Sequence, residues 1–361
     1  MHFYESSIIT TKDGLHCQVY GNEHPPKSIL VKPKYIPTDK VESPALQYRF
    51  ISSHKMNRLN LWTDKDALKS YLSSFKESYP HYHFESSLHD SERIFFSVPI
   101  DKIERIYFPR RGLKELMSMP ESSLDEHLKL VHSFVNFLLK SGLRLKDLGV
   151  TYSTLMGHYL SNYSDINIVV YGKENYWKMM EFLKNAEHPQ LRWKNEKEWL
   201  QFRNKRNRNA IFDNENLFVK SMLRKKSEGF FGNTLFVIFA AEKEEEVWFK
   251  WNSEKYKSLG EATIECTISD NKSSVVRPGC YGVNEAVVVN GPSSSIFNIS
   301  KVVFYSRDYC MIALPGERIK AHGLIEEVTK QDGSKYHRLV VGYFDSYVSD
   351  RREREFIKLI E

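Results

Sequence analysis

An aspartate and an asparagine stand two positions apart in an otherwise apolar stretch of the chain. They are Asp165 and Asn167, in the run Asp-Ile-Asn-Ile-Val-Val-Tyr that ends at Tyr171. The alternation and the β-branched residues predict a strand, on which residues i and i+2 project from the same face. A carboxylate and an amide oxygen are hard oxygen groups of the kind that Mg²⁺ prefers. We therefore expect the two side chains to lie side by side on one face of the strand.

A small turn precedes this strand. Gly149-Val-Thr151 leads into Tyr152 and Ser153, and Gly172 closes the strand. The stretch from Gly149 to Gly172 resembles the signature of the DNA polymerase β-like nucleotidyltransferase superfamily, in which a Gly-Ser pair is followed by Asp-x-Asp on a strand. The complete chain looks like an uncharacterised archaeal group of that superfamily that has added domains at both ends.

The resemblance implies an activity and its ligands. In the superfamily, carboxylates on the strand hold Mg²⁺ ions, which offset the charge of a nucleoside triphosphate (NTP). Carried onto this sequence, Asp165 and Asn167 are the expected catalytic residues, with Asp165 as the metal ligand. Ser153 and Tyr152 are the expected contacts to the bound nucleotide. In such a turn, backbone N–H groups and a hydroxyl approach the phosphates, with a helix N-terminus behind them.

Three positions depart from the superfamily pattern. Tyr152 stands where the glycine of the Gly-Ser pair is expected, so its side chain occupies space that the phosphates need. Asn167 replaces the second carboxylate, and a neutral amide does not bridge two cations. The third carboxylate is expected inside a later strand of the same sheet, but the best candidate, residues 235–241, contains no acid, and Glu242 follows its end. We therefore predict that the metal site has decayed.

The motif lies among predicted elements in an order typical of an α/β unit. Ser122 or Ser123 is expected to cap a long amphipathic helix that Gly142 ends. The elements that follow are a strand at 148–151, a short helix at 152–160, the strand at 165–171 and an amphipathic helix around Met179 and Leu183. Strand, helix, strand and helix in succession indicate an α/β core.

Both ends of the chain are predicted to be rich in strands. Residues 1–112 form an N-terminal β-rich domain with one helix at 63–78. Residues 251–361 have short strands between turn residues, a pattern typical of a small β-barrel or sandwich. The expected strands of the two ends are 15–20, 29–36, 262–269, 286–289, 302–305, 318–328 and 336–344. With a nucleotidyltransferase-like domain at 113–250, the predicted fold is a multidomain α+β and α/β protein with a central mixed sheet.

A basic segment follows the motif. Residues 192–226 hold eleven Lys and Arg against four Asp and Glu, a net charge of +7, whereas the whole chain carries +6. Aromatic residues such as Trp199 and Phe202 interleave with these cations, a composition that favours a polyanion and base stacking. The expected contacts to nucleic acid or phosphate are Arg203, Lys205, Arg206, Arg208, Arg224 and Lys225. The alternative is a solvated helix whose aromatic residues pack inward.

Other reactive side chains carry weaker signals. His81 and His83 have the i, i+2 spacing of two side chains on one strand face, but we do not expect them to hold a metal. His158 is expected on a helix surface, and residues 293–295 in a loop. The four cysteines lack CxxC spacing, which argues against a disulfide framework or a zinc knuckle.

Composition excludes two classes of protein. With 41% hydrophobic and 13% aromatic residues, the chain is not disordered in the main. Its longest apolar run, residues 235–241, is too short to cross a bilayer, and the first residues lack a basic segment followed by an apolar one. We therefore expect a cytoplasmic protein without a membrane partner.

Three functions stay open at this point, and whether the chain is an enzyme is undecided. The first is a pseudoenzyme with the nucleotidyltransferase fold that binds a nucleotide or nucleic acid around a decayed metal site. The second is an active, metal-dependent nucleotidyltransferase that transfers NMP to an unknown acceptor. The third is a non-catalytic protein-interaction subunit. A carboxylate between Glu242 and Glu246 close to Asp165 would favour the second.

Overall fold

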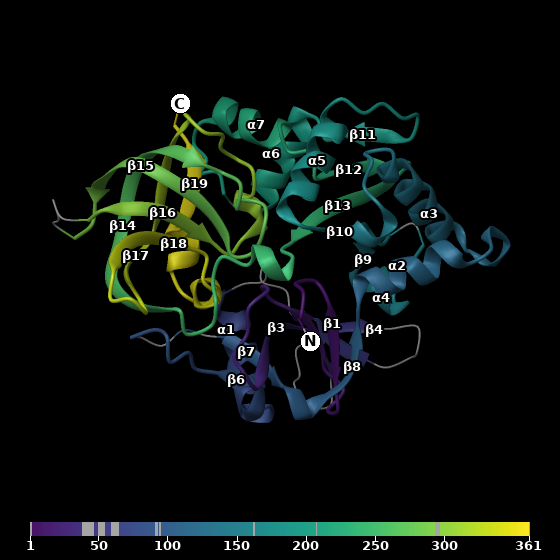
Figure 1. Cartoon of the computed structure of the whole chain (residues 1–361), viewed down its shortest axis with the longest axis horizontal. Helices are drawn as coiled ribbons and strands as arrows, with labels where there is room; N and C mark the ends of the chain where they lie inside the picture. Colours follow the sequence, from purple (N-terminus) through teal and green to yellow (C-terminus); the bar gives the residue numbers. More distant parts are fainter. Residues whose placement is uncertain are drawn as a thin grey trace.

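Three β-sheets, built from successive parts of the chain, organise the computed structural model (Figure 1). The structure describes residues 2–37, 47–49, 55–58, 65–90, 93, 95–161, 163–206, 208–292 and 297–360. The strands of the three sheets lie within residues 8–107, 148–241 and 254–359. The fold is therefore mixed α/β with several sheets, and the exact domain boundaries stay a prediction. The loop expected at 293–295 lies outside the described residues.

The N-terminal sheet has eight strands among the described residues. They are β1 (Ile8–Thr11), β2 (His16–Val19), β3 (Ser28–Pro37), β4 (Gln47–Arg49), β5 (Lys55–Arg58), β6 (His83–Phe84), β7 (Phe95–Pro99) and β8 (Ile103–Tyr107). The antiparallel pairing of β2 with β3 confirms the strands predicted at 15–20 and 29–36. Helix α1 (Lys65–Ser78) packs its apolar face into the core of this unit. It ends at the predicted residue, while residues 63 and 64 lie outside the described residues.

The central sheet has the strand order β11-β12-β13-β10-β9. Its strands are β9 (Leu148–Val150), β10 (Ile166–Tyr171), β11 (Leu191–Trp193), β12 (Glu228–Phe231) and β13 (Thr234–Ala241). β10 and β13 run parallel and the other neighbours antiparallel, so the sheet is mixed. The strand predicted at 235–241 is thus β13, and it lies directly beside the strand that follows Asp165.

Helices cover one face of the central sheet (Figure 1). They include α2 (Pro109–Ser118), α3 (Glu126–Leu139) and α5 (Lys173–Lys184). Their apolar side chains share one core with the buried residues of β10 and β13, such as Ile168 and Phe236. Because the helices occupy this face, the alternate residues of the same strands are left to face the other side of the sheet.

Two predicted helix boundaries are wrong. α3 begins after Asp125, whose carboxylate accepts a hydrogen bond from the backbone N–H of Leu128, and the expected serine caps instead form a separate turn. The short helix predicted at 152–160 is α4 (Tyr152–Met156). It ends early because Gly157 adopts a left-handed conformation, with φ of 70°, that stops a helix.

The basic segment contributes α6 (Glu196–Lys205) and α7 (Glu215–Leu223), which lie between the central and the C-terminal sheets (Figure 1). Trp199 and Phe218 are buried together in a small core between the two helices. The aromatic residues of this segment therefore pack inward to a large extent, as the alternative interpretation of the sequence expects.

The C-terminal sheet has the strand order β14-β15-β16-β18-β17-β19, and β14 pairs with β17 as well. Its elements are β14 (Glu254–Asp270), β15 (Gly279–Asn290), β16 (Ile299–Phe304), β17 (Arg318–Lys330), β18 (Lys335–Val341), α8 (Arg351–Arg354) and β19 (Phe356–Leu359). Every strand predicted for this region is found, and most are longer than predicted.

Short 3-10 turns join several of these elements. They are Pro80–Tyr82, Ile100–Lys102, Glu121–Ser123, Leu145–Asp147, Glu244–Glu246, Arg307–Tyr309 and Phe344–Val348. Over the described ranges, none of the helices has both the length and the apolar character that a bilayer crossing requires.

Candidate functional site

A cavity of about 1040 Å³ lies where the three sheet units meet, and we call it the cleft. Its walls come from β3 in the N-terminal unit, from β10, β12, β13, α4 and α6 in the core, and from the turn after β16 in the C-terminal unit. Asp165 and Asn167 both line the cleft, and so does part of the basic segment. The expected site and the basic segment thus share one cavity.

The floor of the cleft is the face of the central sheet that the helices leave uncovered. On β13 the side chains of Leu235, Val237 and Phe239 are half-buried and line the cleft. The alternate residues, such as Phe236 and Ile238, lie in the helix-covered core. The two-residue period of the strand therefore gives the cleft an apolar, partly aromatic floor.

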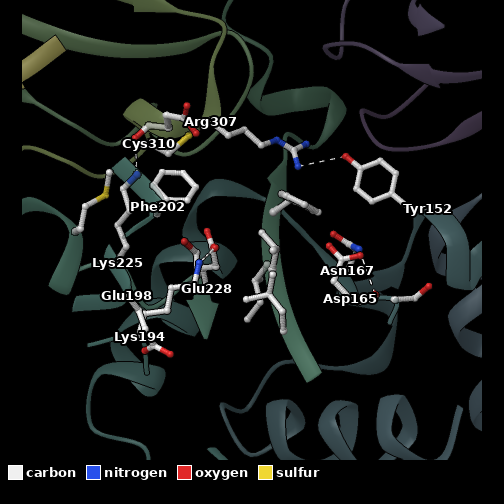
Figure 2. A pocket seen from close by; sticks show the side chains of 18 of the residues that line it. Tyr152, Asp165, Asn167, Lys194, Glu198, Phe202, Lys225, Glu228, Arg307 and Cys310 are labelled. Atoms are coloured by element: carbon white, nitrogen blue, oxygen red, sulfur yellow. Dashed lines mark hydrogen bonds and ion pairs between the residues drawn. The ribbon is translucent and has the colours of Figure 1, made fainter. Parts of the chain in front are cut away.

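Asp165 and Asn167 lie side by side at one edge of this floor, as their spacing predicts (Figure 2). Asp165 directly precedes β10 and is half-buried, whereas Asn167 is the second residue of β10 and is only 3% exposed. The amide nitrogen of Asn167 donates a hydrogen bond of 3.5 Å to the backbone carbonyl of Asp165. The Asp165 carboxylate thus keeps its access to the cleft.

Tyr152 fills the position of the expected glycine and contacts all three units. Its φ of 55° lies in the left-handed region, which costs a residue with a side chain about 1 kcal/mol of conformational strain. The hydroxyl accepts a hydrogen bond of 3.4 Å from Nη1 of Arg307, and Nζ of Lys34 lies 3.6 Å from the ring centroid. The ring meets Phe239 edge-on at 5.6 Å. The turn thus has a backbone conformation that suits glycine, and the ring of Tyr152 fills the space that a glycine would leave open.

The other residue of the turn, Ser153, also lines the cleft. It lies in the first turn of α4, beside the ring of Tyr152 in sequence. α4 is held from behind by His127 of α3, whose Nε2 is 3.0 Å from Oγ1 of Thr154. The two residues expected to contact a nucleotide are therefore both at the cleft, although one of them fills part of it.

The neighbouring strand supplies no carboxylate to Asp165. In the parallel pairing of β10 with β13, Asn167 stands opposite Val237, so the cleft-facing positions nearest to the pair are apolar. The next strand, β12, places Glu228 opposite Val237 on its other side. Two strand spacings, about 10 Å, separate the backbones of Glu228 and Asn167. Glu228 forms an ion pair with Lys194 across the cleft from Asp165 (Figure 2).

Glu242 lies at the opposite end of β13 from the cleft edge that holds Asp165. It lies seven positions after Leu235, which is over ~20 Å of chain at the usual rise per residue in a strand. Its buried carboxylate pairs with Nζ of Lys173 at 3.2 Å and accepts a hydrogen bond from Asn22. Burial raises the pKa of Glu242 to about 7, and Lys173 partly offsets that rise. This acid therefore belongs to a junction with the N-terminal unit.

The carboxylates present do not fit the metal pair that the resemblance implies. Over the part of the chain that the structure describes, no three His, Cys, Asp or Glu side chains are grouped so as to hold a metal ion. Two Mg²⁺ ions bound to a triphosphate require several anionic oxygens, and Asp165 offers the carboxylate while Asn167 offers a neutral amide. Mg²⁺ at Asp165 stays a prediction.

Three of the six predicted phosphate contacts line the cleft: Lys205, Arg206 and Lys225. Lys205 is exposed at the end of α6. Arg206 pairs with Asp308 at 3.3 Å, and Nζ of Lys225 donates a 2.5 Å hydrogen bond to the backbone carbonyl of Asp308. Burial lowers the pKa of Lys225. Lys205 is therefore the most accessible of these three cations.

The other three predicted contacts do not line the cleft. Arg203 of α6 pairs with Glu215 of α7. The partners of the other two lie far away in sequence. Arg208 donates to the backbone carbonyls of Arg352 and Glu355, and Arg224 forms a two-fold ion pair with Glu317 at 2.6 and 3.0 Å. Much of the basic segment thus holds α6 and α7 to the C-terminal unit. The net charge of residues 192–226 overstates the charge that an external anion meets.

The cleft retains an excess of positive charge. Its lining includes six Lys and Arg (Lys34, Lys194, Lys205, Arg206, Lys225 and Arg307) and four Asp and Glu (Asp165, Glu198, Glu228 and Asp308). The half-buried ring of Phe202 lies among these cations, 4.6 Å from the guanidinium of Arg206. Cations beside aromatic rings over an apolar floor suit a ligand with both phosphate and planar groups.

Sequence reasoning counts Arg307 among the cations near turns of the C-terminal region, but it does not place the flanking units at the cleft. Lys34 and Tyr35 come from β3, and Arg307 and Cys310 from the turn after β16. Arg307 is held by the buried carboxylate of Glu5 at 2.6 Å. No local motif marks these residues, because only the packing of three distant segments brings them to the cleft.

Apart from Cys310, the weaker candidates lie outside the cleft. His83 lies 3.5 Å from Glu85, in the N-terminal unit. The ring of His158 lies 5.7 Å from that of His16 on β2, and burial lowers the pKa of both. All four cysteines are free, and three are buried. Only Cys310 reaches the cleft, and burial raises the pKa of its thiol.

One similar protein extends along nearly the whole chain. The sequence is 26% identical over 355 residues to "Uncharacterized protein MJ1086" of Methanocaldococcus jannaschii. The aligned region covers 96% of this chain and 98% of that protein. No family model and no solved structure matches the chain. The similarity thus reaches all three sheet units, and it assigns no activity.

Proposed function

We propose that this protein binds a nucleotide in the cleft, with the base and sugar over the apolar floor and the phosphates toward the cations. The observation that carries the proposal is the open face of the central sheet, where Val237 and Phe239 adjoin Asp165 on one side and cationic side chains on the other. A nucleotide joins a planar, weakly polar base to a strongly anionic phosphate, so it matches both parts of this lining.

The charges of the cleft suggest an orientation for the ligand. Without a metal ion, the carboxylate of Asp165 repels phosphate but accepts hydrogen bonds from sugar hydroxyls. The amide of Asn167 and the hydroxyl of Ser153 add donors beside it. The phosphates then extend toward Lys205, the exposed cation of the cleft. In this arrangement the residues bind and orient the ligand.

The order of elements supports a nucleotidyltransferase-like core. A long helix (α3), a strand (β9), a short helix at the Tyr152-Ser153 turn, the strand β10 and a second amphipathic helix (α5) follow one another. A later strand, β13, is parallel to β10 in the same sheet, where the third acid would be expected. We infer that the central unit has this fold and that two positions expected to hold acids now hold the neutral Asn167 and the apolar Val237.

The pairings of the C-terminal strands are compatible with a nucleic-acid role. β14, β15, β16, β18 and β17 form a cycle of neighbours, since β14 also pairs with β17. We interpret this cycle as a small barrel, an architecture that commonly binds oligonucleotides. Because fold does not establish function, this observation adds less weight than the cleft itself.

Calorimetric titration with a nucleoside triphosphate and the corresponding monophosphate tests the proposal. Lys205→Ala removes an exposed cation at the cleft and should weaken triphosphate binding about fivefold or more, and it should reduce the salt dependence of that binding. Lys197→Ala is the matched control, because Lys197 is also an exposed lysine of α6 but does not line the cleft. Equal effects of the two substitutions, or no binding by the wild type, would contradict the proposal.

An active nucleotidyltransferase is the second candidate, because the carboxylate of Asp165 reaches the cleft. In that case, labelled nucleotide would be transferred to RNA, DNA or protein in the presence of Mg²⁺ or Mn²⁺, and Asp165→Asn would abolish transfer. We expect no transfer by the wild type, since Val237 and Asn167 stand in place of acids. Metal-dependent labelling that is lost in Asp165→Asn would show this expectation to be wrong. If no nucleotide or nucleic acid binds at all, the protein-interaction role becomes the leading one.

A further inference from the structure

Two exposed apolar side chains stand at the rim of the cleft. Tyr163 is 89% exposed and Leu160 is 47% exposed, and both line the cleft together with Asp165. They precede Asp165 in the chain by two and five residues, so the turn that carries them leads directly into the candidate site. We call Leu160 and Tyr163 the lip.

The lip is held by a hydrogen-bonded turn. The backbone N–H groups of Tyr163 and Ser164 donate to the carbonyl of Leu160 at 3.1 and 2.9 Å. In return, the backbone N–H of Leu160 donates to Oγ of Ser164 at 2.9 Å. This closure fixes the backbone of Tyr163 relative to Asp165, so the exposed ring is presented from a defined position.

The location of the lip distinguishes it from ordinary exposed apolar residues. Single exposed apolar side chains are common and need no explanation. Among the described residues, the other large ones are Ile100, Met119, Val287, Val289 and Leu314, and these do not line the cleft. The lip thus extends the apolar character of the floor out to the solvent.

The size of the cleft points to a ligand larger than one nucleotide. Pockets for single small molecules usually occupy about 300–1,000 Å³, and the cleft, with the lip as part of its wall, reaches about 1040 Å³. An aromatic ring with an exposed face stacks on any base, whatever its identity.

We propose that the lip stacks an unpaired base of a single-stranded nucleic acid whose neighbouring nucleotide enters the cleft. The inference rests on the proposed nucleotide binding and assigns its ligand class. Stacking on Tyr163 requires a base whose face is free, which a strand in a duplex does not offer away from its ends. The protein should therefore prefer single strands to duplexes of the same sequence, and oligonucleotides to mononucleotides.

Fluorescence anisotropy with a labelled single-stranded RNA, a single-stranded DNA and a duplex tests the inference, with calorimetry on a mononucleotide in parallel. Tyr163→Ala should weaken single-strand binding at least about fivefold, the lower bound for one base stacked on an aromatic ring, and this loss should exceed the loss of mononucleotide binding in the same variant. Tyr163→Phe should restore single-strand binding, because stacking needs the ring and not the hydroxyl. Leu314→Ala, an exposed apolar residue away from the cleft, should have no effect.

The outcomes separate this inference from the proposed function. If mononucleotides bind but Tyr163→Ala leaves oligonucleotide binding unchanged, the lip has no such role and the nucleotide site stands. If duplexes bind as tightly as single strands, the stacking assignment is wrong. If neither mononucleotides nor oligonucleotides bind at low salt, the proposed function and the inference both fall.

Discussion

Tyr152 is a large aromatic residue on a backbone that suits glycine. Glycine adopts a left-handed φ without strain, whereas here a tyrosine adopts it. Its ring contacts Lys34 and Phe239, and its hydroxyl accepts a hydrogen bond from Arg307. Strained residues of this kind persist when their surroundings hold them in place, and they cluster at functional sites. The ring occupies space beside Ser153, where the superfamily resemblance places the phosphates of a nucleotide.

Replacing this ring should open the turn to phosphate. Tyr152→Gly removes the side chain at a position where glycine adopts the observed backbone without strain, so we expect triphosphate affinity to rise several-fold in calorimetric titration. Tyr152→Phe is the control: it keeps the ring and loses only the hydrogen bond from Arg307, so its affinity should match that of the wild type. Unchanged or weaker binding by the glycine variant would show that the ring does not exclude phosphate.

At the scale of elements, local sequence patterns identified the strand and most helices, but not every boundary. The sequence predicts that Asp165 and Asn167 lie on one face of the strand, because side chains two residues apart on a strand always project to the same side. The capping residue predicted for α3 is wrong, because several residues before the helix are of types that cap helices. Only the folded turn shows that Asp125 is the cap.

The role of the basic segment could not be read from its composition. The acids close to Arg224 in sequence, such as Glu215 and Glu228, do not pair with it, and its ion pair is with Glu317, 93 residues away. A count of local charge assumes that cations face solvent, whereas these pair across an internal boundary. That Lys34 and Arg307 line the cleft could not be predicted from the sequence, because both come from other units of the fold.

At the scale of the whole molecule, a buried acid joins the core to the N-terminal unit. Glu242 is 2% exposed at the end of β13 and contacts Asn22 and Lys173, with Glu246 nearby. Its pKa is raised from 4.5 to about 7. The folded chain therefore binds a proton more tightly than the unfolded chain, so the stabilisation is complete below about pH 4.5 and is lost as the pH rises through 7.

The variant Glu242→Gln isolates this effect. The free energy of unfolding of the wild type, relative to that of the variant, should fall by about 3 kcal/mol between pH 4.5 and pH 8 and stay level above pH 8. Denaturant titrations at several pH values measure this difference, and other titrating groups cancel because both proteins carry them. The exposed Glu244→Gln serves as control and should track the wild type. A difference that does not change with pH would contradict the assignment.

The cleft takes its walls from three distant parts of the chain, and this limits what a shortened protein can report. A fragment that ended after β13 would retain Asp165 and Asn167 but would lose the wall that carries Arg307. Its sheet would present Val237 and Phe239 to water, an apolar strip that invites aggregation. Activity screens on an excised core would thus sample a surface that the intact chain never displays, and a silent fragment would say nothing about the intact site.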